Sequence, residues 1–557
     1  MRKTSYGIAL ALTIALSLVP GSAFATLQED QTPLSEEELQ SALAHGEVGP
    51  APNEPAPAES GESSFVQNFS GETRFDTSSM QALSAYSSSE YVIVVADGGW
   101  PDALCATGLA GVLDCPILLT SGSSLSPQTA DAIRKLGATR AVTLGGELVM
   151  SARVKGDLES LGLKVDRLAG ETRQDTQMMV YEYGKRAPRG RTWSTDAVAF
   201  ASGARFHDAL SFSPVAYAER APIFLTDASG NLNSAQKSAL RGRAFASSVV
   251  LGGPIVTSSD TVSFAGSVSS SGKATVLAGD TRFDTSALVA RWAVDSRGFK
   301  WDNAAFTTAE LPYDALSGSV LQGRGRSVVL LVADGSSPTV TELASHKGSV
   351  SRIRFFGGYL SVSRGTRMSI MHALGHKYSD LAGYRVYIDA GHGQNDSNNG
   401  LWDPGAIGNG WREADLTADL ARRVGNILTN KYGIACYVND KGGYYKLRQA
   451  DAEARDCTSL VSIHFNSGGG TGSESLRHSY HAAESSFDLQ RSVHPGMISG
   501  VGLKDRGMKT QQVAVLSGKI PATLLEICFI DNSHDMATYN SKRDQVAESI
   551  AYAIANA

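Results

Sequence analysis

A threefold internal repeat constrains the fold of this chain more than any other feature of its sequence. The heptapeptide GETRFDT at residues 71–77 returns with small changes at residues 170–176 and 279–285. An Asp-Ala-Leu triplet and a Gly-Gly pair after an apolar run also occur three times, at Asp102, Asp208 and Asp314 and at Gly145, Gly252 and Gly357. Since the three markers recur in one order, we expect three copies of one structural unit in the middle of the chain.

Within each unit, short apolar runs alternate with segments of helical pattern. In the first unit, residues 91–96 (YVIVVA), 116–120 (PILLT) and 141–144 (AVTL) have the length and apolar character of buried strands. Helices are expected between them. The alternation predicts a parallel-sheet α/β module of about 100 residues for each unit.

The polar residues of the markers are expected to stabilise each unit rather than to contact a ligand directly, because buried polar groups usually serve structure. Arg74 and Asp76 could pair with each other. Asp102 could cap the helix that carries Ala103 and Leu104.

The three markers resemble those of the cell wall-binding repeat 2 family, which typically occurs as three tandem units in exported proteins of Gram-positive bacteria. The resemblance divides the region into residues 65–167, 168–272 and 273–380. It implies pseudo-threefold packing and non-covalent attachment to anionic wall polymers. Gln174 stands where the family has phenylalanine, and residues 327–330 (SVVL) replace the Pro-Ile of the other units. The third unit is therefore expected to pack differently or to bind less well.

The first 25 residues are typical of a cleaved secretory signal. Arg2 and Lys3 precede an apolar run at residues 8–19, and small residues at 23–25 suit cleavage before Thr26. Residues 26–64 hold nine Asp or Glu residues and no Lys or Arg, with five prolines. We therefore predict a disordered acidic linker. One short helix at residues 35–44 is possible, since Ser35 and Glu38 have capping-box spacing.

Charge, hydropathy and cysteine content give no support for a nucleic-acid-binding protein, an integral membrane protein or a disulfide-rich scaffold. A net charge of −6 and a pI near 6.0 give no electrostatic case for nucleic acid. After the signal, no run of 18 apolar residues remains, so no integral membrane segment is expected. Five cysteines in so long a chain do not make a disulfide scaffold, although Cys105 and Cys115 could pair.

The repeat markers stop after Gly383, and the remaining residues suffice for one further core. A short strand pattern leads into the turn Gly391-His392-Gly393, and the apolar run at residues 460–466 (LVSIHFN) places His464 near its end. Open α/β sheets put their sites at the carboxyl ends of strands. Two such histidines beside glycine-rich turns therefore suggest a metal centre.

Glu413 is expected to supply a carboxylate to that centre. It opens a helical pattern in which Leu416, Leu420, Val424 and Leu428 form a buried face. Two imidazoles and one carboxylate, with an open fourth position, are what a catalytic zinc requires. Asp415 or Asp419 could be the ligand instead.

Glu526 lies within the apolar run at residues 522–532 (ATLLEICFIDN). A glutamate in such a strand is costly to ionise unless a cation is near. A buried salt bridge would explain it. A general base beside the metal would explain it equally well.

Residues 384–557 resemble the zinc-dependent N-acetylmuramoyl-L-alanine amidases of the amidase 3 type. The family's GHG motif, the glutamate after GAxG, SIHxN and the late ExGFxxN match His392, Glu413, His464 and Glu526. By this resemblance, the first three bind Zn²⁺ and Glu526 is the catalytic acid and base. The implied reaction is hydrolysis of the amide that joins N-acetylmuramic acid to L-alanine of peptidoglycan.

The resemblance also assigns substrate contacts to Arg506 and to Asn466 of the SIHxN motif. The chain departs from the family in two places near the site. Residues 394–402 look longer than usual, and Cys528 replaces a glycine on the same strand face as Glu526. That cysteine could narrow the pocket or put a thiol beside it.

Together these features predict an exported α/β protein with three tandem parallel-sheet wall-binding units. They are followed, at residues 381–557, by an α/β zinc amidase domain with a central twisted sheet flanked by helices. We expect it to be secreted and held on the cell wall of a Gram-positive bacterium. A catalytically inactive wall adhesin and a zinc peptidase that cuts within the stem peptide are the alternatives.

Overall fold

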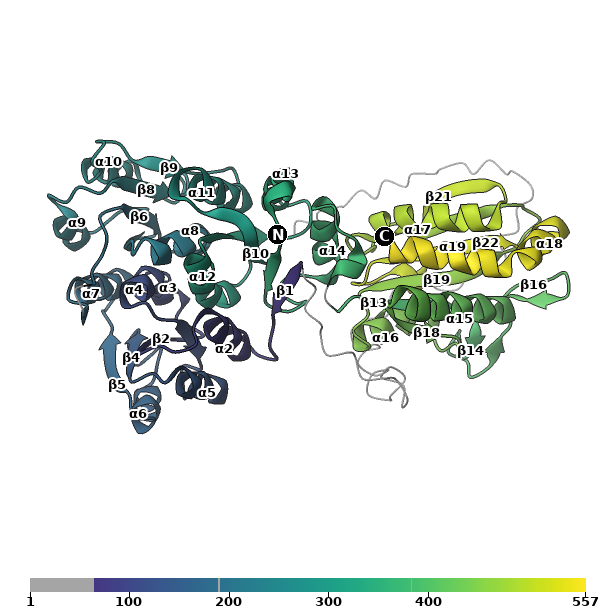
Figure 1. Cartoon of the computed structure of the whole chain (residues 1–557), viewed down its shortest axis with the longest axis horizontal. Helices are drawn as coiled ribbons and strands as arrows, with labels where there is room; N and C mark the ends of the chain where they lie inside the picture. Colours follow the sequence, from purple (N-terminus) through teal and green to yellow (C-terminus); the bar gives the residue numbers. More distant parts are fainter. Residues whose placement is uncertain (1–64, 189–190, 382) are drawn as a thin grey trace, which may run out of the picture.

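The computed structural model describes residues 65–188, 191–381 and 383–557, apart from the side chains of Pro101 and Asp102. The expected signal, the acidic linker with its short helix, and the capping role of Asp102 lie outside this description. Figure 1 shows two lobes along the long axis, with the repeats in purple to teal and the C-terminal lobe in green to yellow. Among the described residues, no helix is both long and apolar enough to cross a membrane.

The first lobe contains three four-stranded parallel sheets with equivalent strand orders, β3-β2-β4-β5, β7-β6-β8-β9 and β11-β10-β12-β1. The strands of the first sheet are β2 (Tyr91–Ala96), β3 (Ile117–Thr120), β4 (Arg140–Leu144) and β5 (Lys164–Leu168). Those of the second are β6 (Ala197–Ser202), β7 (Ile223–Thr226), β8 (Ser247–Leu251) and β9 (Thr275–Leu277). Those of the third are β10 (Lys300–Thr308), β11 (Ser327–Val332), β12 (Ile353–Phe356) and β1 (Val66–Phe69).

The chain closes this lobe with its first described strand. β1 pairs in parallel with β12, with Val66 opposite Ile353 and Phe69 opposite Phe356. The third sheet is therefore completed by residues from the start of the first sequence unit, so sheets and sequence units do not coincide. The strand order of the third sheet matches the other two, so the replacement of Pro-Ile leaves the topology of this sheet unchanged. Ser327, which replaces a proline, is buried there and donates its hydroxyl to the Asp302 backbone oxygen at 2.7 Å.

Helices cover the sheets and fill the centre of the lobe. They are α2 (Arg74–Ala85), α3 (Trp100–Ala103), α4 (Ala106–Leu113), α5 (Pro127–Leu136), α6 (Ala152–Ser160), α7 (Arg173–Lys185), α8 (His207–Ala218), α9 (Ser234–Leu240), α10 (Ser259–Ser267), α11 (Arg282–Arg297), α12 (Tyr313–Gly325), α13 (Pro338–Ser345) and α14 (Arg364–Ala373). The equivalent helices α4, α8 and α12 pack against one another. Gly111 allows the closest approach, because a Cβ there would lie 2.1 Å from the backbone oxygen of Tyr217.

The GETRFDT marker is a helix start. Thr73 and Asp76 form a reciprocal capping box at α2, in which the Thr73 amide donates to Asp76 Oδ2 at 3.0 Å. The same boxes open α7 and α11. A Cβ on Gly71 would lie 2.1 Å from Asp76 Cβ, which explains the glycine. Asp76 therefore bonds Thr73 and not Arg74, whose guanidinium instead lies 4.3 Å from the ring centre of Tyr313.

The other two markers pack against each other. Gly357 has φ of +94°, and a Cβ on it would lie 2.3 Å from Asp314 Oδ2. The same arrangement joins Gly252, at φ of +90°, to Asp208. The aspartate of each described pair thus occupies space that any larger residue at the glycine would need. These contacts agree with a structural role for both markers.

The C-terminal lobe is built on one six-stranded sheet of order β18-β13-β19-β22-β20-β21. Its strands are β13 (Arg385–Ala390), β18 (Ala435–Asn439), β19 (Ser459–Asn466), β20 (Ser473–His478), β21 (Asp505–Gln511) and β22 (Ala522–Phe529). The first four in sheet order are parallel, whereas β20 and β21 run in the opposite direction. The amino ends of β20 and β21 therefore lie at the same edge as the carboxyl ends of β13, β19 and β22.

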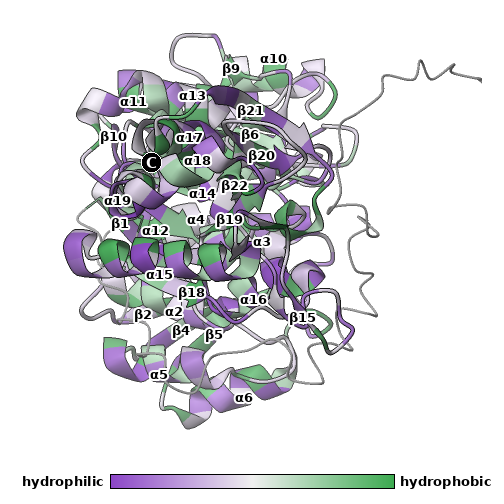
Figure 2. Ribbon diagram, turned by 90° about the vertical axis from the view of Figure 1, so that its right-hand side faces the viewer, coloured by the Kyte–Doolittle hydropathy of each residue, from purple (hydrophilic) through white to green (hydrophobic). Residues whose placement is uncertain are grey.

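Three helices cover one face of this sheet: α15 (Glu413–Tyr432), α17 (Ser486–Val501) and α19 (Arg543–Ala555). Of these, α19 packs against both α15 and α17. Hydrophobic and hydrophilic residues alternate around α15, as Figure 2 shows, and its apolar side faces the core. The opposite face carries a smaller cluster with Tyr387, Leu460 and Leu524, bordered by α16 (Arg448–Ala454). The α/β class predicted for both lobes is confirmed.

The two lobes meet through the third unit. The carboxylate of Glu484 accepts hydrogen bonds from the Gly335 amide and, at 2.8 Å, from the Thr366 hydroxyl. Ser369 and Ser485 hydroxyls lie 2.6 Å apart, and the Tyr378 amide donates to the last residue, Ala557, at 2.9 Å. The carboxyl edge of the C-terminal sheet therefore points away from the repeats, and the strand β16 marks the far end of the molecule in Figure 1.

Candidate metal centre

His392 lies two residues after the end of β13, in the left-handed region at φ of +67°. Its neighbour Gly391 is required because a Cβ there would lie 2.2 Å from the ring of His464. Gly405 is required for a similar reason, since a Cβ on it would lie 2.6 Å from His392 Cδ2 and 2.8 Å from Glu413. These glycines let two loops close around the buried imidazole.

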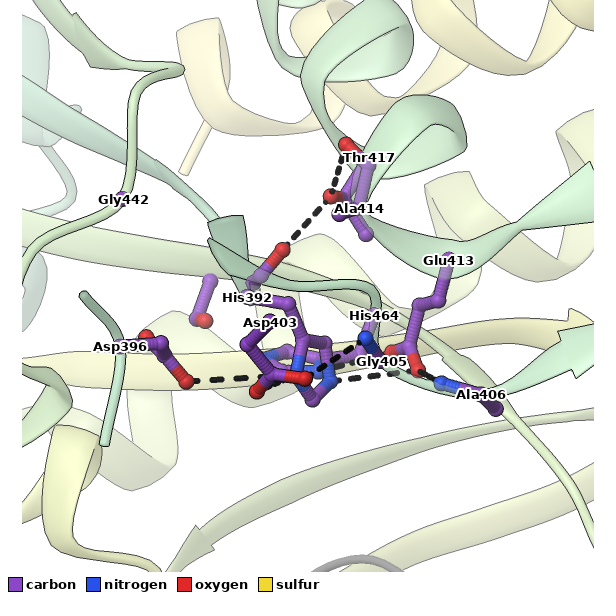
Figure 3. Close-up of polar contacts among 12 residues, drawn as sticks. His392, Asp396, Asp403, Gly405, Ala406, Glu413, Ala414, Thr417, Gly442 and His464 are labelled. Carbon is purple, nitrogen blue, oxygen red and sulfur yellow. Dashed lines mark hydrogen bonds and ion pairs between the residues drawn. The ribbon is translucent and has the colours of Figure 1, made fainter. Parts of the chain in front are cut away.

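Glu413 is the first residue of α15 and is buried between the two histidines (Figure 3). Its Oε2 lies 3.2 Å from His392 Nε2, and its Oε1 lies 3.0 Å from His464 Nδ1. The Ala406 and Phe465 amides donate to the same carboxylate at 2.9 and 3.0 Å. Each carboxylate oxygen is therefore held in place by the backbone.

The three side chains that the sequence singled out come together. The donor atoms of His392, Glu413 and His464 all lie within 4.8 Å of one another, and all three residues are buried. The two other carboxylates that the sequence left open do not join them. Asp415 pairs with Arg412 at 2.6 Å, and Asp419 pairs with Arg423 at 2.9 Å.

Sequence reasoning missed Asp403, which precedes the Pro-Gly-Ala segment. Its Oδ2 lies 2.8 Å from His392 Nδ1, while its Oδ1 accepts the Gly405 amide at 2.9 Å. His392 therefore uses one ring nitrogen for Asp403 and the other for Glu413. A carboxylate behind a ligating histidine fixes the ring orientation and the tautomer. The signal for it was the Asp-Pro-Gly turn, whose carboxylate had no assigned partner.

Electrostatics at the centre favour a cation. Burial opposes a charged imidazole, but Glu413 and Asp403 outweigh it and raise the pKa of His392 well above its ordinary value. Burial likewise opposes the ionised form of Glu413, yet the two histidines lower the pKa of this carboxyl. The buried carboxylates thus need positive charge, which protons on the imidazoles or a metal ion can supply.

Glu526 lies on β22 directly opposite His464 of β19. It is buried, and its Oε2 has no hydrogen-bond partner. Burial raises the pKa of Glu526 to about 7, helped by the negative charges of Glu413 and Glu474. No salt bridge to Glu526 occurs among the described residues, so the alternative of a structural ion pair lacks support.

The far side of the centre is charged. Glu474 on β20 lies opposite Glu526 and accepts hydrogen bonds at 2.5 Å from both Arg506 and Lys509 of β21. Asn466 donates to the other Glu474 oxygen at 3.3 Å. Both residues that the sequence assigned to substrate contact, Asn466 and Arg506, therefore belong to one network beside Glu526.

The structure corrects the expectation for Cys528. His464 pairs with Glu526, but Asn466 pairs with Phe529, so β22 contains a bulge between these positions. The simple alternation that would put Cys528 on the face of Glu526 is interrupted there. Its sulfur is buried against Met536 of α18 (Ser533–Ser541), at 3.9 Å from Sδ. Cys105 and Cys115, which could have paired, form no disulfide with each other.

Residues 394–402, which looked enlarged, form part of a hairpin. β14 (Gly393–Gln394) pairs antiparallel with β15 (Trp402–Asp403), and Asp396 between them is buried. Arg448, itself buried, bonds Asp396 at 2.9 Å and lies 3.3 Å from Asp389 at the end of β13. This ion pair ties residues 394–402 to the sheet.

Comparison with known proteins matches both lobes to known families. A family described as N-acetylmuramoyl-L-alanine amidase matches residues 386–556, and the cell wall binding domain 2 family matches residues 68–155, 167–262 and 276–367. The fold and centre thus define a wall-binding repeat protein with a hydrolase domain. The chain thus carries an N-acetylmuramoyl-L-alanine amidase domain at residues 386–556 and three cell wall binding domain 2 units before it.

Individual relatives match either most of the chain or part of it. The N-acetylmuramoyl-L-alanine amidase LytC of Bacillus subtilis is 24% identical over 498 residues, which cover 87% of this chain and 93% of LytC. An endolysin of Bacillus phage SPP1 is 36% identical over 181 residues, covering 30% of this chain and 64% of the endolysin. The structure of Cwp6 from Clostridium difficile aligns over 95% of this chain and 86% of Cwp6, with a TM-score of 0.51 and 21% identity, and shows the fold alone.

Proposed function

We propose that this protein is an exported zinc-dependent peptidoglycan hydrolase that cleaves the amide between N-acetylmuramic acid and L-alanine. One observation carries the proposal. The cluster of His392, Glu413 and His464 lies beside Glu526, whose buried Oε2 has no partner. Membership of the amidase family supports the choice of bond.

His392, Glu413 and His464 would hold the metal. Two imidazoles and one carboxylate within 4.8 Å form the donor set of catalytic zinc sites, and the surplus of buried carboxylates suits a divalent cation. When bound, Zn²⁺ supplies a Lewis acid that polarises the scissile carbonyl and lowers the pKa of water. Asp403 holds the His392 ring in the required tautomer through Nδ1.

Glu526 moves the protons of the reaction. A carboxyl with a pKa of about 7 is shared between its two protonation states at neutral pH, which suits both acceptance and return of a proton. Its carboxylate takes a proton from the attacking water. The resulting carboxylic acid then protonates the departing amine of L-alanine, which restores the carboxylate.

Asn466 and Arg506 orient the substrate on the charged side of the centre. The stem peptide carries at least its terminal carboxylate, and Arg506 and Lys509 together exceed the charge of Glu474 by one. That excess favours an acidic peptide. We therefore assign the stem peptide to the β20–β21 side of the site.

The repeats associate the chain with the cell wall, as their family description states. We propose that residues 65–167, 168–272 and 273–380 form the wall-binding units and that residues 381–557 form the amidase domain. Their ligands would be anionic wall polymers of a Gram-positive bacterium, which the exposed arginines Arg173 and Arg282 suit. Export would depend on a signal at residues 1–25, followed by an acidic linker at residues 26–64.

Digestion of purified peptidoglycan by the full-length protein tests the proposal. Mass spectrometry should find intact stem peptides that start with L-alanine, together with glycan strands that carry free lactyl groups. A chelator should abolish both products, and added Zn²⁺ should restore them. Fragments cut within the stem peptide would indicate a peptidase instead. Absence of any product from folded, zinc-loaded protein would indicate the wall adhesin.

A further inference from the structure

Two short hairpins beside the metal centre expose apolar side chains. The first is β14–β15, and the second pairs β16 (Ile407–Gly408) with β17 (Trp411–Arg412). Leu401 and Ile407 are each 66% exposed, and Trp402 is 42% exposed. Clustered exposed apolar side chains on a folded protein usually mark a binding surface. We call Leu401, Trp402, Ile407 and Arg412 the rim strip.

The hairpins that carry the rim strip also hold the metal centre. Trp402 is followed by Asp403, which bonds His392. Ile407 is preceded by Ala406, whose amide donates to Glu413. Along this backbone, residues that bond the metal-centre side chains are thus next to the exposed side chains of the rim strip. The rim strip is therefore one residue away from the groups that fix the catalytic side chains.

The rim strip is continuous across the two hairpins. The Arg412 guanidinium lies 4.8 Å from the ring centre of Trp402, and Ile407 lies directly opposite Arg412 in the second hairpin. The Arg412 side chain donates a hydrogen bond to the Asp415 carboxylate at 2.6 Å, which holds the guanidinium in place. Trp411 is different, because Arg543 of α19 lies 4.6 Å from its ring centre and ties it to the body of the lobe.

The walls of the site differ in chemistry. Arg506, Lys509 and Glu474 make the β20–β21 side charged. The hairpin that carries Trp402 follows β13, and strands β19, β22 and β20 lie between β13 and β21 in the sheet. The second hairpin extends to the end of β22, where Asn409 donates to the Ile530 backbone oxygen at 2.8 Å. A substrate that joins a sugar to a peptide through the scissile amide must place its two halves on different sides of the metal centre. The charged side suits the peptide, which leaves the rim strip for the sugar.

We propose that the rim strip is a glycan subsite that binds the sugar rings next to the scissile amide. Pyranose rings have apolar faces lined by C–H groups, and these pack on the exposed part of the Trp402 ring. Arg412 stacks on the same indole and directs N–H donors at sugar hydroxyl and N-acetyl oxygens. The inference rests on the proposed function, because it takes the glycan strand as the occupant, and it names where that strand lies.

Binding of peptide-free glycan strands tests the subsite without turnover. The full-length, zinc-loaded Glu526→Gln protein is titrated by calorimetry with purified GlcNAc–MurNAc oligosaccharides that carry free lactyl groups. Adding Trp402→Ala should raise the Kd about tenfold, the loss expected for an exposed aromatic anchor. Trp402→Phe should restore most of the affinity. Tyr480→Ala, which removes a 75% exposed ring at the opposite edge of the sheet, should leave the Kd unchanged.

Kinetics of the active protein on polymeric peptidoglycan provide a second readout. Trp402→Ala should raise KM while kcat stays near the wild-type value, because a contact to the sugar rings that is equal in the ground state and the transition state affects binding alone. Equal Kd values with and without Trp402 would overturn the proposal. So would an equal loss of affinity for a free stem peptide. If the wild type cleaves no amide but its glycan binding still depends on Trp402, the proposed function fails and the glycan subsite stands.

Discussion

Glu526 lies opposite His464 on one side and opposite Glu474 on the other, so the three residues form one row across β19, β22 and β20. Their environments separate their roles. Burial raises the pKa of Glu526 to about 7. Burial would raise that of Glu474 too, but Lys509 and Arg506 lower the pKa of this carboxyl overall. The strand register thus places Glu526, the proposed proton carrier, between His464, a proposed metal ligand, and the carboxylate of Glu474, whose ionised form its two cationic neighbours favour.

Asp403 is predicted to tighten metal binding through His392. Asp403→Asn keeps the shape of the side chain but removes the charge behind Nδ1 at 2.8 Å. Loss of such a partner typically weakens metal affinity by roughly 10–100-fold. Competition with a chromogenic chelator measures this affinity. The matched control is Asp440→Asn, whose aspartate pairs with Arg422 instead. Equal zinc affinity in both variants would contradict the role given to Asp403.

Asp208 is predicted to make the stability of the repeat lobe depend on pH. Burial raises the pKa of Asp208 to about 6, although Arg205 opposes this, whereas an unfolded aspartate has a pKa near about 3.9. Its stabilising contribution is therefore complete below about pH 4 and is lost as pH rises through about 6. Asp208→Asn mimics the protonated form, so it should be more stable than wild type at pH 8 by about 3 kcal/mol at most.

Calorimetry between pH 5 and pH 8 measures this difference as a smaller fall in the Tm of the repeat lobe for Asp208→Asn. Asp131→Asn serves as the control, since that aspartate is exposed and pairs only with Lys135 on the surface. If the Tm of both variants falls with pH as much as the Tm of the wild type, Asp208 is not the responsible group.

Glu484 is predicted to hold the two lobes together. Glu484→Ala leaves the Gly335 amide and the Thr366 hydroxyl without their partner, which costs about 1–3 kcal/mol when such donors are buried. Amide hydrogen exchange at Gly335 should therefore accelerate, because its amide donates to Glu484 directly. Glu453→Ala removes a half-exposed partner of Arg364 across the same junction and should change little. Unchanged exchange in Glu484→Ala would mean that other contacts fix the junction.

The repeat architecture followed from the sequence because its markers are local. Thr73 and Asp76 sit three residues apart, so their capping box needs no knowledge of the rest of the fold. The same is true of the short apolar strands. The pairing of β1 with β12, which completes the third sheet, could not be predicted in this way. Val66 pairs with Ile353 across nearly the whole first lobe, and nothing in the spacing of the repeats distinguishes this pairing from one within the first unit.

For the metal centre too, the sequence identified some residues and missed others. His392 and His464 were found because each lies at a strand end beside glycines, and Glu413 because it opens a helix. The hydrogen bond of Asp403 depends on how a loop folds back, which the sequence does not encode locally. Cys528 was misplaced because strand alternation holds only without a bulge, and the register shift after Glu526 arises from pairing with β19.

The most direct test of the account replaces the proposed proton carrier alone. Glu526→Gln should fold, bind one zinc ion with wild-type affinity, and release stem peptides from peptidoglycan at least about 10²-fold more slowly. Mass spectrometry of the released L-alanine peptides, with metal analysis of the same samples, measures both. Wild-type rates in a zinc-loaded Glu526→Gln protein would contradict the central claim that Glu526 carries the protons of an amidase.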